Sequence, residues 1–188
     1  APGKVGLKNF LPAAHHVNLA NAEGINFLQD KGAKNVGTSL SFASIHPFDD
    51  KEQNVAASLR VHAAINKTFI DPMLGKWYPT TDVPFLRKLD NYAKSGDESR
   101  IRAKPDFVGV QVYTREVVKH AYLVPYVQAK IVSAEMRQKP ITNLGQEIYY
   151  PALKEILDWL IPHMGAKKVP IYITECGISA EESDATHP

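Results

Sequence analysis

Apolar positions along the chain alternate between helical spacing and short continuous runs. Helical spacing predicts one helix over residues 12–30, one that starts after the aspartates at 49–50 and reaches Phe69, and one from Pro151 to Gly165. Runs dense in β-branched and aromatic residues predict strands, which cover residues 35–42, 106–113 and 169–174. The segments between them, 71–105 and 114–150, are rich in Pro, Gly and charge and indicate loop, with a short helix over 83–93.

The order helix, strand, helix, strand, helix, strand favours an α/β fold. Alternation of this kind is typical of parallel strands joined by right-handed helical crossovers. The second and third strands are almost wholly apolar, as expected of strands that are covered on both faces. We therefore predict a single domain over residues 1–188 with a parallel sheet.

Composition and charge exclude several classes of protein. The 188 residues are 44% apolar and 22% charged, which is a globular composition. The charges of the 22 basic and 20 acidic residues nearly cancel. The sequence has no dense run of basic residues of the kind that binds nucleic acid, so no nucleic-acid partner is predicted. No apolar run approaches the roughly 20 residues that cross a bilayer, so no membrane span is predicted. The single cysteine excludes an internal disulfide.

Glu175 is the residue that fits a purely structural interpretation least well. It directly follows the apolar strand 169–174, and an unpaired carboxylate at a buried strand end costs several kcal/mol. In parallel α/β folds the carboxyl ends of the strands are also where active sites assemble. Tyr113 ends the preceding strand, where its phenol can donate a hydrogen bond to that carboxylate. The alternatives are a strand end that has reached solvent for Glu175 and a rim-packing role for Tyr113.

Five segments, in the same order along the chain, resemble motifs of one enzyme family. They are AHH at 14–16, FIDP with GKWYP at 69–79, DFVGVQVYT at 106–114, LGQEIYYPAL at 144–153 and IYITECG at 171–177. These are similar to A-x-H-H, F-L-D-P…G-x-Y-P, D-F-x-G-x-N-Y-Y-T, G-W-E-I-Y-P-x-G-L and I-T-E-N-G of glycoside hydrolase family 1, the β-glucosidase-type retaining glycosidases.

The resemblance implies a partial (β/α)8 TIM barrel, namely the fifth to seventh parallel strands with their helices. It implies hydrolysis of β-glycosidic bonds with retention, in which Glu175 is the nucleophile and Tyr113 orients it. The implied substrate is a β-linked oligosaccharide or an aryl or alkyl glycoside, and the implied chemistry needs no cofactor and no metal.

The family's acid/base residue belongs to an N-E-P motif, and this sequence contains no Asn-Glu-Pro. Retention needs that second carboxylic acid about 5–5.5 Å from the nucleophile. We therefore expect the chain to be a fragment whose barrel is completed by the remainder of the same parent chain, and which is inactive when isolated. Glu116 and Glu147 are candidates for a substitute acid.

Several positions depart from the family pattern. Gln111 stands where the motif has Asn, Ser41 stands where Asn commonly ends the fifth strand, and Cys176 replaces the Asn after the nucleophile. Gln111 and Ser41 remain candidates for sugar binding, and Trp77, in a loop, is a candidate for stacking on a sugar ring. The departures keep two alternatives open: a catalytically degenerate barrel that binds carbohydrate or acts as a scaffold, and a small doubly wound domain with another ligand. Against the second, no Gly-rich phosphate loop follows any predicted strand.

Overall fold

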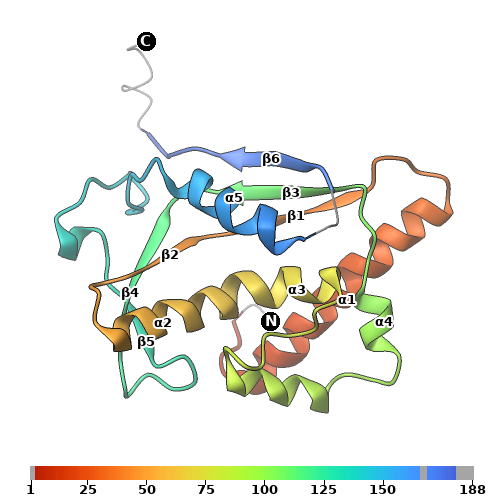
Figure 1. The fold of residues 1–188 in the computed structure, drawn as a ribbon, viewed down its shortest axis with the longest axis horizontal. Helices are drawn as coiled ribbons and strands as arrows, with labels where there is room; N and C mark the ends of the chain where they lie inside the picture. The colour runs from red at the N-terminus through yellow and green to blue at the C-terminus, as the bar shows by residue number, and fades with distance from the viewer. Residues whose placement is uncertain (1–2, 166–168, 181–188) are drawn as a thin grey trace, which may run out of the picture.

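A three-stranded parallel sheet runs along one side of the molecule (Figure 1). The structure is a computed structural model, and it describes residues 3–165 and 169–180. The strands are β1 (Gly37–Ser41), β3 (Phe107–Val112) and β6 (Ile171–Cys176), in the order β1-β3-β6, and both neighbouring pairs are parallel. The predicted parallel arrangement is confirmed.

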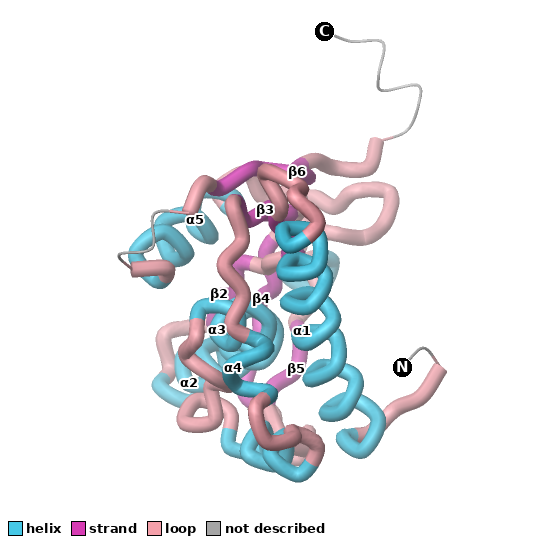
Figure 2. Tube along the Cα trace, turned by 90° about the vertical axis from the view of Figure 1, so that its right-hand side faces the viewer, coloured by secondary structure: helices cyan, strands magenta, loops and turns pink. Residues whose placement is uncertain are grey.

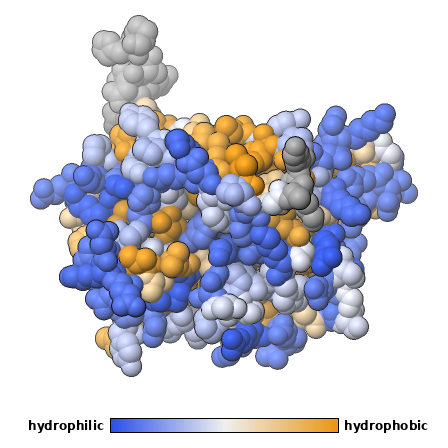
Figure 3. Space-filling model, in the orientation of Figure 1, coloured by the Kyte–Doolittle hydropathy of each residue, from blue (hydrophilic) through white to orange (hydrophobic). Residues whose placement is uncertain are grey.

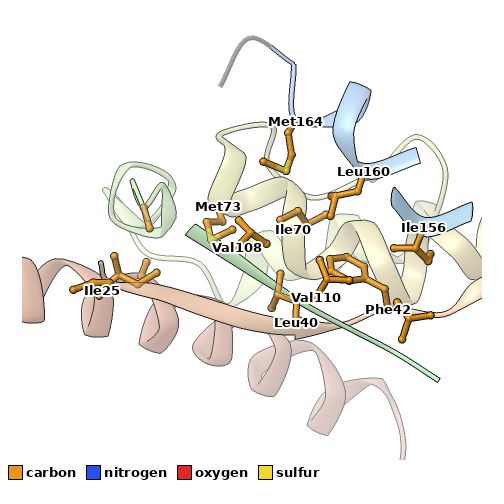
Figure 4. Close-up of a cluster of buried hydrophobic side chains, with 14 of the residues drawn as sticks. Ile25, Leu40, Phe42, Ile70, Met73, Val108, Val110, Ile156, Leu160 and Met164 are labelled. Carbon is orange, nitrogen blue, oxygen red and sulfur yellow. The ribbon is translucent and has the colours of Figure 1, made fainter. Parts of the chain in front are cut away.

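Three helices cover one face of this sheet: α1 (Leu7–Asp30), α3 (Thr68–Leu74) and α5 (Ala152–His163). Alternate residues of the strands point into the space between sheet and helices, where they form the main core (Figure 4). The buried members include Ile25, Leu40, Phe42, Ile70, Met73, Val108, Val110, Val112, Ile156 and Leu160. This core packs the sheet against its helix layer, and none of the three helices covers the other face of the sheet.

A second, smaller sheet continues from the carboxyl ends of the first. It consists of β2 (Ser44–Pro47), β4 (Arg115–His120) and β5 (Ala129–Ile131), with β2 parallel to β4 and β4 antiparallel to β5. Only two residues separate β1 from β2, and two separate β3 from β4, so each neighbouring pair bends together into the second sheet (Figure 2). The prediction of loop throughout residues 114–150 is therefore wrong.

Short helical elements complete the described chain. Helix α2 (Glu52–His62) packs on the second sheet and passes through a π-helical turn, Ala63–Lys67, into α3, so the predicted single helix ending at Phe69 is three consecutive elements. The other helical elements are η2 (Pro84–Asn91), α4 (Asp97–Ile101) and η3 (Glu135–Arg137). None of the helices within the described ranges is long and apolar enough to cross a membrane.

Helix α1 begins five residues before its predicted start and contains Pro12. Leu11 is buried in a second core cluster with residues of η2 and α4, and Leu7 packs against the same cluster. Burial of these leucines outweighs the loss of the one backbone hydrogen bond that Pro12 cannot donate.

The expectation that the second and third strands are covered on both faces is wrong for β6, most of which is exposed, whereas the residues of β3 are buried or half-buried. On the face away from the helices, Ser39 and Ser41 of β1 and Tyr172 of β6 are exposed. In the space-filling view, apolar residues come to the surface along the upper edge, where Figure 1 places β6 (Figure 3). The face opposite the helix layer, called the inner face below, carries the candidate site.

Candidate active site

A β-bulge in β6 sets the direction of the Glu175 side chain. Val110 of β3 lies opposite Ile173, whereas the next residue, Gln111, lies opposite Glu175, so Thr174 is an extra residue in the ladder. Without that extra residue, Glu175 would lie opposite Val112, whose side chain is buried on the helix side. The bulge therefore places the carboxylate on the inner face.

Thr174 is held at the bulge by its own side chain. Its hydroxyl donates to the carbonyl oxygen of Val110 at 3.3 Å and hydrogen-bonds the hydroxyl of Ser39 at 2.5 Å. Thr174 has no partner residue on β3, and these two side-chain hydrogen bonds hold it instead. They fix the backbone directly before Glu175.

Two side chains from β3 and its carboxyl end donate hydrogen bonds to the Glu175 carboxylate. The amide of Gln111 donates to Oε1 at 2.9 Å, and the phenol of Tyr113 donates to Oε2. Both oxygens are thereby oriented by hydrogen bonds from fixed donors. Glu175 is exposed in this chain and not buried, which corrects the expectation of a buried strand end.

Ser41 belongs to the same row across the sheet. It lies opposite Gln111, which in turn lies opposite Glu175, so the row Ser41–Gln111–Glu175 crosses all three parallel strands on the inner face. The structure therefore brings together four of the five residues singled out from the sequence, the fourth being Tyr113 just beyond β3.

An open cavity of about 630 Å³ lies in front of the carboxylate. Its described lining residues are Tyr113, Leu144, Gln146, Thr174, Glu175, Cys176, Gly177, Ile178 and Ser179. Sequence reasoning missed Leu144 and Gln146, which project from the segment before α5; the match of 144–153 to a family motif was the one signal that singled out this segment. A volume of this size admits a small organic ligand.

Trp77 lies elsewhere in the fold. Its ring packs against Tyr78 at 4.8 Å and against the fully buried His15 at 6.2 Å between ring centroids, beside the second core cluster. His15 also hydrogen-bonds the phenol of Tyr78 and the carboxylate of Asp97, and burial raises the pKa of Tyr78 to about 12. Trp77 is therefore not among the described residues that line the cavity in front of Glu175.

Neither candidate substitute acid lies among the described residues that line the cavity. Burial raises the pKa of Glu147, but hydrogen bonds from Arg115 and Arg137 outweigh burial and lower this pKa to about 2. A carboxylate held ionised in this way is unsuited to donate a proton at neutral pH. Burial raises the pKa of Glu116, which lies on β4 opposite Ile45 of β2. In the described ranges, no three His, Cys, Asp or Glu side chains converge to hold a metal ion.

Comparison with known proteins relates this chain to a family. The profile of "Glycosyl hydrolase family 1" matches residues 1–187. The chain is 28% identical over 178 residues to a beta-glucosidase of Agrobacterium sp., covering 94% of this chain and 38% of that protein. It is also 28% identical to beta-glucosidase A of Thermotoga maritima, covering 97% of this chain and 40% of that protein. The chain thus spans about two fifths of the length of these curated relatives.

Solved structures agree with the sequence relatives. The AHE enzyme from Alicyclobacillus herbarius superposes with a TM-score of 0.85 at 26% identity, covering 96% of this chain and 40% of that one. The virulence factor SghA in complex with its substrate analogue salicin gives a TM-score of 0.81 at 27% identity, covering 95% and 39%. The three parallel strands and their helices are thus part of a TIM barrel, as the sequence predicted. The chain belongs to glycosyl hydrolase family 1.

Proposed function

We propose that this chain contributes the nucleophile side of a retaining β-glycosidase, with Glu175 as the nucleophile. The observation that carries the proposal is the position of Glu175: a bulge turns its carboxylate onto the inner face, where Gln111 and Tyr113 hold both oxygens beside a cavity. A carboxylate that is oriented and faces an open cavity is what attack on an anomeric carbon requires.

The reaction would proceed by double displacement. Glu175 attacks the anomeric carbon, the glycosidic bond breaks, and a second carboxylic acid protonates the departing oxygen. In the second step that same group, now a carboxylate, takes a proton from water, which attacks the anomeric carbon and releases Glu175. Tyr113 and Gln111 keep the Glu175 oxygens in place through both steps.

The acid/base group is proposed to come from outside this chain. Among the described residues that line the cavity, Glu175 carries the one carboxylate. We infer that the rest of the barrel, from the same parent chain, supplies the second carboxylic acid, and that the isolated chain does not turn over substrate.

The proposed substrate is a β-glucoside, including β-glucosides of phenols. Two relatives bear the name beta-glucosidase, and the structure of SghA holds the substrate analogue salicin. Gln111, which stands where the family motif has Asn, places a longer amide side chain beside the proposed nucleophile. We therefore infer that this branch still takes β-glucosides but discriminates glucose from other sugars to a different degree.

The test is covalent labelling of the full-length parent protein with a 2,4-dinitrophenyl 2-deoxy-2-fluoro-β-glucoside, followed by peptide mass analysis. The expected result is one fluoroglucosyl group on Glu175, its absence in Glu175→Gln, and unchanged labelling in Glu135→Gln, which removes an exposed carboxylate on η3. Labelling of another residue, or an active Glu175→Gln variant, would refute the assignment.

A catalytically degenerate barrel is the second candidate. It is favoured by the three departures from the family motifs around the site, Ser41, Gln111 and Cys176. Binding of a β-glucoside to the parent protein without labelling or turnover would support this function in place of hydrolysis.

A further inference from the structure

A small hairpin forms one side of the cavity. Residues 141–147 fold back on themselves through a bridge between Ile141 and Glu147, and the Thr142 amide donates to the Gln146 carbonyl at 2.8 Å. Leu144, at the tip, is 76% exposed, and it lines the cavity together with Gln146. A short hairpin of this kind is marginal alone, so its position depends on what holds its base.

Glu147 holds that base through its side chain. The carboxylate is 4% exposed and accepts hydrogen bonds from Arg115 at 2.8 and 3.1 Å and from Arg137 at 2.5 Å. Arg137 in turn donates to the carbonyl oxygen of Val132 at 3.1 Å, and the Arg115 guanidinium lies 4.0 Å over the Tyr149 ring. Bidentate, buried pairs of this type have a fixed geometry, unlike exposed ion pairs.

Glu147 also holds the segment that carries Tyr113. Its backbone carbonyl accepts a hydrogen bond from the hydroxyl of the buried Thr114 at 2.7 Å. Tyr113 and Thr114 form the two-residue gap between β3 and β4, where neither sheet ladder fixes the backbone. The Thr114 hydroxyl is therefore a direct restraint on the residue that donates to Glu175.

We propose that Glu147 is a positioning residue that couples the hairpin 141–147 to the Tyr113–Glu175 pair. The Glu147 carboxylate holds the hairpin through Arg115 and Arg137, and the Glu147 carbonyl oxygen holds Thr114. A displacement of the hairpin is therefore transmitted to Tyr113, which donates to Glu175. The proposal rests on the proposed function, because it assigns Glu147 an effect on the reaction of Glu175.

A double-mutant cycle tests the coupling in the full-length protein. Thr114→Val keeps the side-chain shape and removes the hydroxyl that joins Glu147 to the Tyr113 segment. We expect kcat for an aryl β-glucoside to fall about tenfold in the Tyr113-containing protein and less than about twofold when Tyr113→Phe is already present. Equal effects in the two backgrounds would show that Thr114 acts only on general stability, and would overturn the proposal.

Glu147→Gln tests the carboxylate, with Glu135→Gln as the matched control. The glutamine leaves the partly buried guanidinium groups of Arg115 and Arg137 without their ion-pair partner. We therefore expect faster hydrogen exchange at the amides of residues 142, 145 and 146 together with a lower kcat. The control is expected to change neither. Faster exchange with an unchanged kcat would overturn the coupling.

A crystal structure of Thr114→Val decides the inference independently of turnover. We expect the Tyr113 hydroxyl to have left the Glu175 carboxylate, and an unmoved phenol would refute the coupling. A wild-type protein that neither hydrolyses the β-glucoside nor is labelled by the fluoroglucoside would refute the proposed function. The position of Tyr113 in the Thr114→Val structure would still decide whether Glu147 positions Tyr113.

Discussion

Tyr113→Phe removes the phenol hydroxyl and leaves the ring, so it isolates one hydrogen bond to the proposed nucleophile. A hydrogen bond to a charged group contributes about 1.5–3 kcal/mol. Glu175 is exposed and keeps its bond from Gln111, so water replaces part of the lost interaction and the lower end of that range applies. A loss of about 1.5 kcal/mol corresponds to roughly a tenfold lower kcat/KM.

The assay for Tyr113→Phe is steady-state hydrolysis of an aryl β-glucoside by the full-length protein, together with the rate of labelling by the fluoroglucoside. Both rates are expected to fall by about the same factor, because the same carboxylate attacks in each. Gln111→Leu, which removes the other donor, is the comparison and is expected to have an effect of similar size. A kcat/KM within twofold of wild type for Tyr113→Phe would refute the reasoning that its hydrogen bond orients Glu175.

Three further predictions concern stability. Glu147→Gln is expected to lower the free energy of unfolding by about 3 kcal/mol above pH 4.5. Because the folded-state pKa of Glu147 is lowered to about 2, this difference between variant and wild type should shrink as the pH falls from 4.5 towards 2. Urea unfolding of both proteins across this pH range measures it. Leu160→Ala, at a fully buried core position, should cost about 3 kcal/mol, whereas Ile161→Ala, on the exposed side of the same helix, should cost under about 1 kcal/mol by the same measurement. Gly109→Ala should lower the free energy of unfolding by about 1–3 kcal/mol, because the added Cβ would lie 2.9 Å from atoms of Ser39 on the neighbouring strand. Gly24→Ala should raise the thermal midpoint, because Gly24 lies in helix α1 with open space around it and alanine favours a helix.

The main helices and the parallel sheet could be predicted from the sequence because their signals are local. The helix through Leu160 and the strand through Val110 both have strong periodicity or strong β-propensity, and both lie where the pattern placed them. Helix α1 shows the limit of such signals: Pro12 indicates a helix start, but packing of Leu7 and Leu11 against residues distant in the chain extends the helix.

The second sheet was missed because its strands are short and carry weak signals. Strand β2 contains a proline, and β4 has only Val117 and Val118 between charged residues. Their stability comes from pairing with each other as continuations of β1 and β3, which is a non-local property. Pattern reasoning within one segment has no access to such pairing.

At the candidate site, the hydrogen bond between Tyr113 and Glu175 could be predicted from the sequence, but the bulge could not. An extra residue in β6 exists only relative to the register of β3, and the sequence of β6 alone is equally compatible with a regular ladder. The contacts of Glu147 with Arg115 and Arg137 were also outside the reach of sequence reasoning, because the three residues are separated in the sequence and meet only in the folded chain.

The row Ser41–Gln111–Glu175 has a consequence for how the proposed sugar preference can change. Neighbouring strands lie about 4.8 Å apart, so the sheet sets three polar side chains at a fixed pitch that loop changes do not alter. A substitution at position 41 or 111 changes only how far the polar group of that side chain extends from its fixed backbone position. We expect such substitutions to change which sugar hydroxyls are recognised while the Glu175 carboxylate, the proposed nucleophile, keeps its place.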